Sequence, residues 1–200
     1  MFYDTAKNDH GLPHNPFKAI VSPRPIGWVS TVDAQGRSNL APYSFFNAVC
    51  DTPPMVMFSS SQYKDSISNA ESTGEFVCNM CSFDLMDEMN KSSAPLASGV
   101  SEFEASGLEA AACKLVDAPR VAKAYAALEC KVIDVRRLTG LNGQETNNWV
   151  AIGQVVGVHI REDALVDGRF DVTKVRPLSR LGYLDYAVVD DVFELERPGA

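Results

Sequence analysis

The chain has 200 residues, of which 46% are hydrophobic and 22% are charged, and these proportions exclude a disordered, collagen-like or coiled-coil chain. Eighteen Lys and Arg residues against 26 Asp and Glu give a formal net charge of −8, which argues against nucleic acid as a partner because a phosphate backbone attracts basic surfaces. No apolar run approaches the ~20 residues that span a bilayer, and the amino terminus has no hydrophobic leader, so we expect no membrane partner and a cytoplasmic location.

The length fits one compact domain, since single hydrophobic cores stop growing only near ~250 to 300 residues. We expect a single domain over residues 1–200, with an amino-terminal arm over 1–18 and a barrel over 19–187. Five cysteines are an odd number in a chain that is large enough to fold without disulfides, so we expect reduced thiols.

The first half of the chain reads mostly as strands. Ile26–Val32 and Arg37–Ala41 flank Asp33–Gly36, where the glycine supplies the positive φ that closes a short hairpin. Met55–Ser59 follows two prolines, which cannot donate to a ladder and so suit the start of a strand. Glu75–Cys81 predicts a further strand.

The second half contains two longer strands. In Trp149–Ile160 the even-numbered positions other than Gln154 are apolar, and the odd-numbered positions include Gly153 and Gly157. We expect the even-numbered face to pack against a core and the other face to let another group approach closely. Leu128–Leu138 predicts a second long strand, whose alternation slips around Val132 and indicates a bulge. Strands at this spacing predict a mainly β fold, a closed or nearly closed antiparallel barrel.

Helices are few and short. Asp65–Thr73 begins with an acidic residue that can cap a helix and ends before Gly74, a residue type that tolerates the left-handed conformation. Asp84–Lys91 and Arg120–Ala127 also predict helices. The tract between them, Ser92–Pro119, predicts loop and short helix over the barrel.

Polar and aromatic residues concentrate where strands and their loops would otherwise be apolar. Serine hydroxyls and a lysine at a helix start suit a phosphate, because a helix amino terminus offers free N–H groups and a positive dipole. A pair of phenylalanines beside backbone donors suits a flat heterocycle. The alternative is that the hydroxyls are ordinary strand and cap residues and that the phenylalanines are core. The candidate cofactor-binding residues are Ser30, Thr31, Asn39, Ser44, Phe45, Phe46, Asn47, Ser59, Ser60, Ser61, Lys64, Asp65 and Ser66.

An ordered series of motifs covers most of the chain from Pro23 to Tyr186. The series is Pro23–Asp33, then Gly36, Asn39, Ala41–Asn47, Pro53-Pro54, Lys64–Ser66 and Arg180–Gly182. It resembles the flavin reductase-like family of FMN-binding split barrels, which includes the flavoredoxins. The resemblance implies a six-stranded antiparallel Greek-key split barrel, a homodimer, and FMN near the subunit interface.

The resemblance also implies roles for the candidate residues. Ser30 and Thr31 would face the flavin, and Ser44–Asn47 would run beside the isoalloxazine. Ser59–Ser61 together with Lys64–Ser66 would hold the ribityl phosphate.

The chain departs from the family pattern at two positions. Ser66 stands where the phosphate motif commonly ends in Thr, which keeps the hydroxyl. Tyr183 follows Gly182 where many relatives have a second glycine, so the shape of the pocket near Arg180 is open.

The implied chemistry is hydride transfer from NAD(P)H to flavin, as in an NAD(P)H:flavin oxidoreductase or a flavoredoxin-like electron carrier. No catalytic side chain is required, and the sequence has no Ser/His/Asp or paired-carboxylate constellation. A partner oxygenase or another electron acceptor would take the electrons. One alternative is a non-catalytic FMN-binding or electron-transfer module that serves a partner protein. Another is a related barrel that binds haem or a pyridoxine phosphate, although His159 is the sole plausible axial ligand for haem.

The homodimer has a second line of support in the sequence. Trp149, Gly153 and Gly157 share the small-residue face of one predicted strand, and we expect them to form an exposed rim that another subunit covers.

Other chemistry-bearing residues carry less weight. Cys78 and Cys81 form a C-x-x-C motif, but in a strand they point to opposite faces, so we expect neither a redox dithiol nor a metal site. His10 and His14 are separated by a proline that breaks the helix needed to align them as ligands. His159 either contacts the flavin or nicotinamide or is a satisfied histidine at the barrel end.

Overall fold

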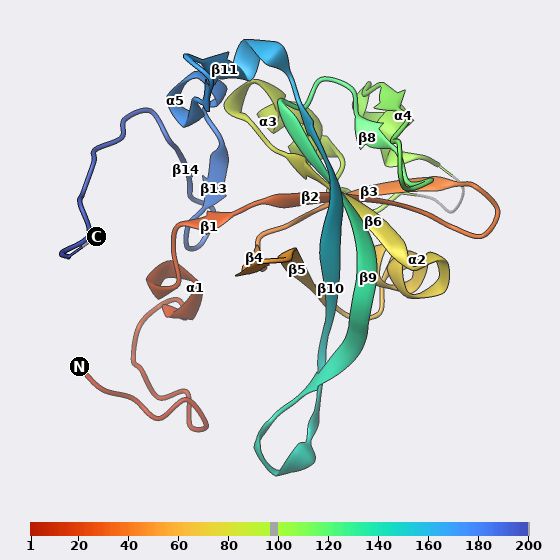
Figure 1. Cartoon of the computed structure of the whole chain (residues 1–200). Helices are drawn as coiled ribbons and strands as arrows, with labels where there is room; N and C mark the ends of the chain where they lie inside the picture. The colour runs from red at the N-terminus through yellow and green to blue at the C-terminus, as the bar shows by residue number, and fades with distance from the viewer. Residues whose placement is uncertain (97–99, 200) are drawn as a thin grey trace.

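The computed structural model describes residues 1–96 and 100–199 (Figure 1). Its centre is one seven-stranded sheet in the order β3-β2-β6-β9-β10-β5-β4, and all of its neighbouring pairs are antiparallel. The strands are β2 (Gly27–Val32), β3 (Ser38–Tyr43), β4 (Phe46–Asp51), β5 (Pro54–Ser61), β6 (Glu75–Met80), β9 (Ala126–Thr139) and β10 (Glu145–Ile160).

The sheet curls into a barrel because its two edge strands are consecutive in the chain. β3 and β4 lie at opposite edges of the sheet, yet only Ser44 and Phe45 connect them. β3 approaches the β4–β5 hairpin without forming a ladder: the Tyr43 and Phe58 rings are 5.0 Å apart. We call the line between β3 and the β4–β5 hairpin the seam. β4 accounts for the seventh strand, which the sequence did not predict.

Large apolar side chains fill the barrel, and α2 (Asp65–Thr73) contributes Ile67 and Ala70 to this interior cluster. Phe76 packs against the backbone of Gly153, where a Cβ would lie 2.6 Å from the ring. A fully buried aromatic or aliphatic side chain contributes about 1.5–3 kcal/mol, so this cluster stabilises the barrel.

The sequence prediction for the faces of β10 is correct in one part and wrong in another: the odd-numbered face does let another side chain approach closely, but it lines the barrel interior. The odd-numbered residues Trp149, Ala151 and Gly153 face the interior, whereas Val158 and Ile160 are 59% and 48% exposed. Glycine lies on the inner face because Phe76 occupies the space a side chain would take. The expected exposed rim of Trp149, Gly153 and Gly157 is therefore wrong.

A second cluster around Trp28 and Leu40 lies on the outside of the barrel, covered by α3 (Met86–Lys91) and α4 (Glu102–Ser106). Trp28 Nε1 donates to Ser92 Oγ at 2.9 Å. The remaining elements are α1 (Phe17–Ile20), β1 (Arg24–Pro25), η1 (Phe83–Leu85), β7 (Ala110–Ala111), β8 (Arg120–Val121), η2 (Leu141–Gly143), η3 (Glu162–Ala164), β11 (Leu165–Val166), β12 (Arg169–Phe170), α5 (Val172–Val175), β13 (Leu178–Arg180) and β14 (Tyr186–Val188). In Figure 1, α1, β13 and β14 lie left of the barrel, and α2 and α4 lie right of it.

Several sequence predictions are confirmed. α2 has the predicted bounds and ends at Gly74, whose φ is 73°. However, Lys64 is the N-cap, and no side chain caps this helix, so the capping role expected of Asp65 is wrong. The predicted bulge lies at Ile133, where the β9–β10 register shifts. The helix predicted over Asp84–Lys91 is present as η1 followed by α3.

The helix predicted over Arg120–Ala127 is wrong. Val121 is buried, and its N–H donates to Asn79 Oδ1 at 2.8 Å, while Ala126 already pairs with Ile160 in the sheet. Pairing with neighbouring strands overrides the helix preference of an alanine-rich segment. Among the described residues, no helix is both long enough and apolar enough to cross a membrane.

Candidate functional site

Amide and hydroxyl side chains meet at one end of the seam. Asn39 Nδ2 donates to Ser66 Oγ at 2.9 Å and to Thr31 Oγ1 at 3.2 Å, and Asn69 Nδ2 donates to Thr31 Oγ1 at 3.1 Å. β2, β3 and α2 therefore converge on one group, the amide–hydroxyl cluster of Thr31, Asn39, Ser66 and Asn69. Sequence reasoning missed Asn69, although it lies three residues after Ser66 and so shares a helix face with it.

Tyr43 and Ser60 extend this cluster along the seam. Burial raises the pKa of Tyr43, and interactions with the Ser66 and Ser60 hydroxyls partly offset that rise. Ser60 is 1% exposed and lies on β5, so the two sides of the seam meet here through polar atoms.

The start of α2 borders the same end of the seam. Its first N–H groups have no intrahelical acceptor, and Lys64 is exposed in the N-cap position with Asp65 after it. Ser61 is exposed at the end of β5. Ser59 Oγ accepts from Asn148 Nδ2 at 3.5 Å.

Several predicted residues are not brought to the cluster, among them Ser59, which follows the alternation of β5 and faces away from Ser60. Ser30 is fully buried on the other face of β2, where its hydroxyl donates to Pro119 O and accepts from Asn79 Nδ2 at 3.0 Å. Successive strand residues point to opposite faces, so Ser30 and Thr31 cannot both face the seam. Asn47 is exposed, and its Oδ1 accepts from the N–H of Ala48 at 2.9 Å.

Ser44, Phe45 and Phe46 lie at the other end of β3. Phe46 packs into the interior at Gly27, where a Cβ would lie 2.5 Å from the ring. The Phe45 ring centroid is 5.9 Å from the Arg24 guanidinium carbon. Ser44 lines a cavity of about 320 Å³. Five strand residues cover about 17 Å, so the two ends of β3 are separated by the scale of a three-ring system with a ribityl phosphate.

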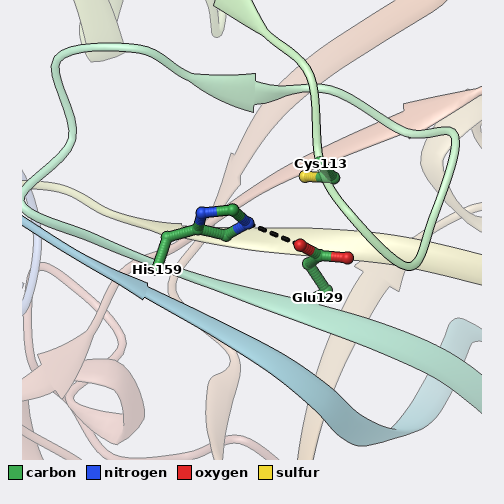
Figure 2. Close-up of side chains that lie close together, drawn as sticks. All are labelled: Cys113, Glu129 and His159. Carbon is green, nitrogen blue, oxygen red and sulfur yellow. Dashed lines mark hydrogen bonds and ion pairs between the residues drawn. The ribbon is translucent and has the colours of Figure 1, made fainter.

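A separate group of side chains has the composition of a metal site. Figure 2 shows Cys113, Glu129 and His159, whose potential ligand atoms lie within 4.8 Å of one another. Glu129 is 1% exposed, and it accepts from His159 Nε2 and from the N–H groups of Lys114 and Leu115 at 2.9 and 2.6 Å. Sequence reasoning missed this group because its members come from a loop and two strands.

This group is best explained as a clamp that holds the loop to the barrel. Both Glu129 oxygens already accept hydrogen bonds. Burial, with the nearby Glu129 charge, raises the pKa of the Cys113 thiol to about 11. Glu75 on β6 binds the next turn of the same loop, accepting from the N–H groups of Asp117 and Ala118 at 2.6 and 2.9 Å. His159 is thus a hydrogen-bonded histidine, as the second interpretation of the sequence expected.

The two cysteines of the C-x-x-C motif belong to different clusters. Cys78 lies in the barrel interior, whereas Cys81 packs in the outer cluster with Trp28. Burial raises the pKa of both thiols, that of Cys81 to about 12. The prediction that they face apart is confirmed.

Comparisons with known proteins agree with this geometry. Residues 21–178 match the family model of the flavin reductase like domain. Uncharacterized protein BH2278 of Halalkalibacterium halodurans is 34% identical over 183 residues, which cover 89% of this chain and 87% of that protein.

Two solved structures are similar over almost their whole length. Nitrilotriacetate monooxygenase component B from Bacillus cereus has a TM-score of 0.89 and 28% identity, with 98% of each chain covered. Pseudomonas fluorescens 2-nitrobenzoate 2-nitroreductase NbaA has a TM-score of 0.84 and 26% identity, with 100% of this chain and 97% of that chain covered.

The curled sheet with its open seam is a split barrel, and this fold class was predicted from the sequence. The chain belongs to the flavin reductase-like family. That family places it among flavin-related oxidoreductases.

Proposed function

We propose that this protein binds FMN along the seam and transfers hydride from NAD(P)H to it. The observation that carries the proposal is the convergence of the family's motif residues: Thr31, Asn39 and Ser66 come from three elements and meet in one hydrogen-bonded cluster. Neutral hydroxyls and amides at a helix start are donors that a phosphate monoester and a ribityl chain require.

The phosphate would be held at the start of α2. Lys64 would supply the positive charge, and the free N–H groups of the first turn would donate to the phosphate oxygens. Ser61 is exposed beside them and would add a hydroxyl. The Asp65 carboxylate would repel a phosphate bound at this position. Its backbone N–H, rather than its carboxylate, would therefore face the phosphate.

The flat ring system would lie toward the other end of β3. Backbone groups of Ser44 and Phe45 connect the two edges of the sheet and would run beside the ring. FMN, when bound, supplies the hydride-accepting chemistry, so the side chains have to position the ring and exclude water. We assign no catalytic acid or base.

The electrons would pass to a partner oxygenase or another acceptor, as the name of the Bacillus cereus component suggests for that protein. We also propose a homodimer. β4 is an edge strand whose residues Asn47, Ala48 and Val49 are exposed, and an uncovered strand edge favours contact with another chain.

The test is the absorption spectrum of the purified protein loaded with FMN. Anaerobic addition of NADH or NADPH should bleach the flavin band, faster than it does for the same concentration of free FMN. A bound flavin that neither cofactor bleaches faster than free FMN would contradict the enzymatic proposal and favour the alternative of a non-catalytic FMN-binding module.

A further inference from the structure

The cavity at the Ser44 end of β3 brings together three positive charges. Lys18 comes from α1, Arg24 from β1 and Arg180 from β13, and all three line the cavity of about 320 Å³. No described Asp or Glu residue lines it. In a chain with a net charge of −8, such a local excess of positive charge marks a site that attracts anions.

The fold holds two of these charges directly opposite each other. Arg24 and Arg180 are partners in the β1–β13 ladder, an arrangement in which like charges oppose one another. The pKa of Arg24 is lowered by burial and by the nearby Arg180 charge. A bound anion would offset the repulsion between Arg24 and Arg180 and the unfavourable burial of the Arg24 charge.

Arg24 is also incompletely satisfied. It is 7% exposed, and its terminal nitrogens donate to the carbonyl groups of Lys18, Val21 and Leu181. Its Nε is buried and has no hydrogen-bond partner among the described residues. A buried donor without a partner is costly, and a bound water, ion or other molecule is one way to satisfy it.

Tyr183 shapes the mouth of the cavity. Its φ is 54°, a left-handed conformation that favours glycine, and its carbonyl accepts from Arg180 Nη2. The side chain is 50% exposed, and its ring lies 5.6 Å from that of His14. A tyrosine held in an unfavourable backbone conformation at a cavity indicates a functional constraint.

We propose that this cavity binds the anionic group, a carboxylate or a phosphate, of a molecule that reacts with the bound flavin. The cavity lies next to the proposed position of the flavin ring, because Ser44 lines the cavity and precedes Phe45, the residue expected beside that ring. The role toward a reacting molecule rests on the proposed function, whereas the anion site itself does not.

The test is a calorimetric titration of the full-length protein, with and without FMN, using benzoate, its neutral counterpart benzamide, and inorganic phosphate. Benzoate or phosphate should bind, and benzamide should bind at least tenfold more weakly than benzoate. The benzoate and phosphate titrations distinguish a carboxylate substrate from a phosphate-bearing one. Binding of benzoate or phosphate in the absence of FMN would support the anion site even if the proposal of FMN binding were wrong.

Substitutions then test whether the residues that line this cavity bind the anion. Arg180→Gln and the exposed Lys18→Gln should each weaken anion binding, Arg180→Gln by about ten- to a hundredfold, while FMN affinity changes less than twofold. Arg169→Gln, at a side chain that is 85% exposed, is the matched control and should have no effect. The proposal is overturned if neither anion binds, if both variants bind anions like wild type, or if Arg180→Gln weakens FMN instead.

Discussion

The two ends of β3 differ in charge. Beyond Asn39, a cavity of about 670 Å³ is lined by four carboxylates, those of Asp33, Asp65, Glu102 and Glu104, with Arg37 as the cation among the described lining residues. At the Ser44 end, the lining has three cations and no described carboxylate. The same strand thus connects an acidic environment with a basic one.

This difference shows that a phosphate at the Asn39 end needs directed donors rather than general positive charge. The start of α2 provides N–H groups, and Lys64 adds one charge close to them. The basic end has three cations and neutral side-chain donors such as Ser44, Ser93 and Asn90, but none of its described lining residues begins a helix. We therefore expect the cofactor phosphate at the first end and a second anion at the other.

The largest expected effect follows from removing the positive charge of Lys64 at the start of α2. Lys64→Ala should weaken FMN binding by about ten- to a hundredfold, because a hydrogen bond to a charged group contributes about 1.5–3 kcal/mol. Fluorescence titration of FMN measures the change. Riboflavin lacks the phosphate and should bind both proteins almost equally, and an equal loss for both flavins would contradict the placement of the phosphate.

A region away from both ends should affect stability alone. Glu129→Gln should lower the free energy of unfolding by about 1.5–3 kcal/mol while FMN affinity stays unchanged, because an amide cannot accept from both loop N–H groups. Urea unfolding measures the loss, and the exposed Glu109→Gln is the control. A large loss of FMN affinity would show that the clamp and the seam are coupled.

The same variant has a defined pH dependence. Burial acts to raise the pKa of Glu129, but the N–H groups of Lys114 and Leu115 and the His159 ring lower it below the ordinary 4.5. The folded state then binds fewer protons than the unfolded state, so the contribution is present above pH 4.5 and is lost as pH falls through the lowered pKa. The stability gap between wild type and Glu129→Gln should narrow below pH 4.5.

Neighbouring residues of β2 test which strand face serves the cofactor. Thr31→Val removes a hydroxyl that accepts from Asn39 and Asn69, and should weaken FMN binding by about two- to tenfold, the range for a neutral hydrogen bond. Ser30→Ala should leave FMN affinity unchanged, because its hydroxyl faces Asn79. Equal effects of the two variants in a flavin titration would contradict the assignment of faces.

The smallest effect is expected at the C-x-x-C motif. A Cys78→Ala, Cys81→Ala variant should oxidise NAD(P)H at the wild-type rate, because the thiols lie in different clusters and are protonated at neutral pH. The rate of NADH loss at 340 nm measures this. A folded, FMN-binding variant that no longer oxidises NAD(P)H would make the thiols part of electron transfer.

Local patterns in the sequence were sufficient for α2 and for the first hairpin. α2 has a clear stop at Gly74, and the hairpin turns at Gly36, whose φ is 79°. Local patterns were not sufficient to predict which face of a strand points into the barrel. The odd-numbered face of β10 lines the interior, where Phe76 fills the space over Gly153, a contact between segments far apart in the chain.

The site was predictable to a similar extent. The resemblance to the family implies Thr31, Asn39 and Ser66, which the structure brings into one cluster, and it also implies Ser30, which the structure turns away because successive residues of β2 face opposite sides. The three cations at the Ser44 end come from residues 18, 24 and 180, and only the β1–β13 pairing brings them together.

The most direct test of the contrast between the two ends is a crystal structure of the protein with FMN. We predict the phosphate within hydrogen-bond distance of the N–H groups that begin α2 and of Lys64, with the ring beside Ser44 and Phe45. A phosphate bound instead between Lys18, Arg24 and Arg180 would contradict it.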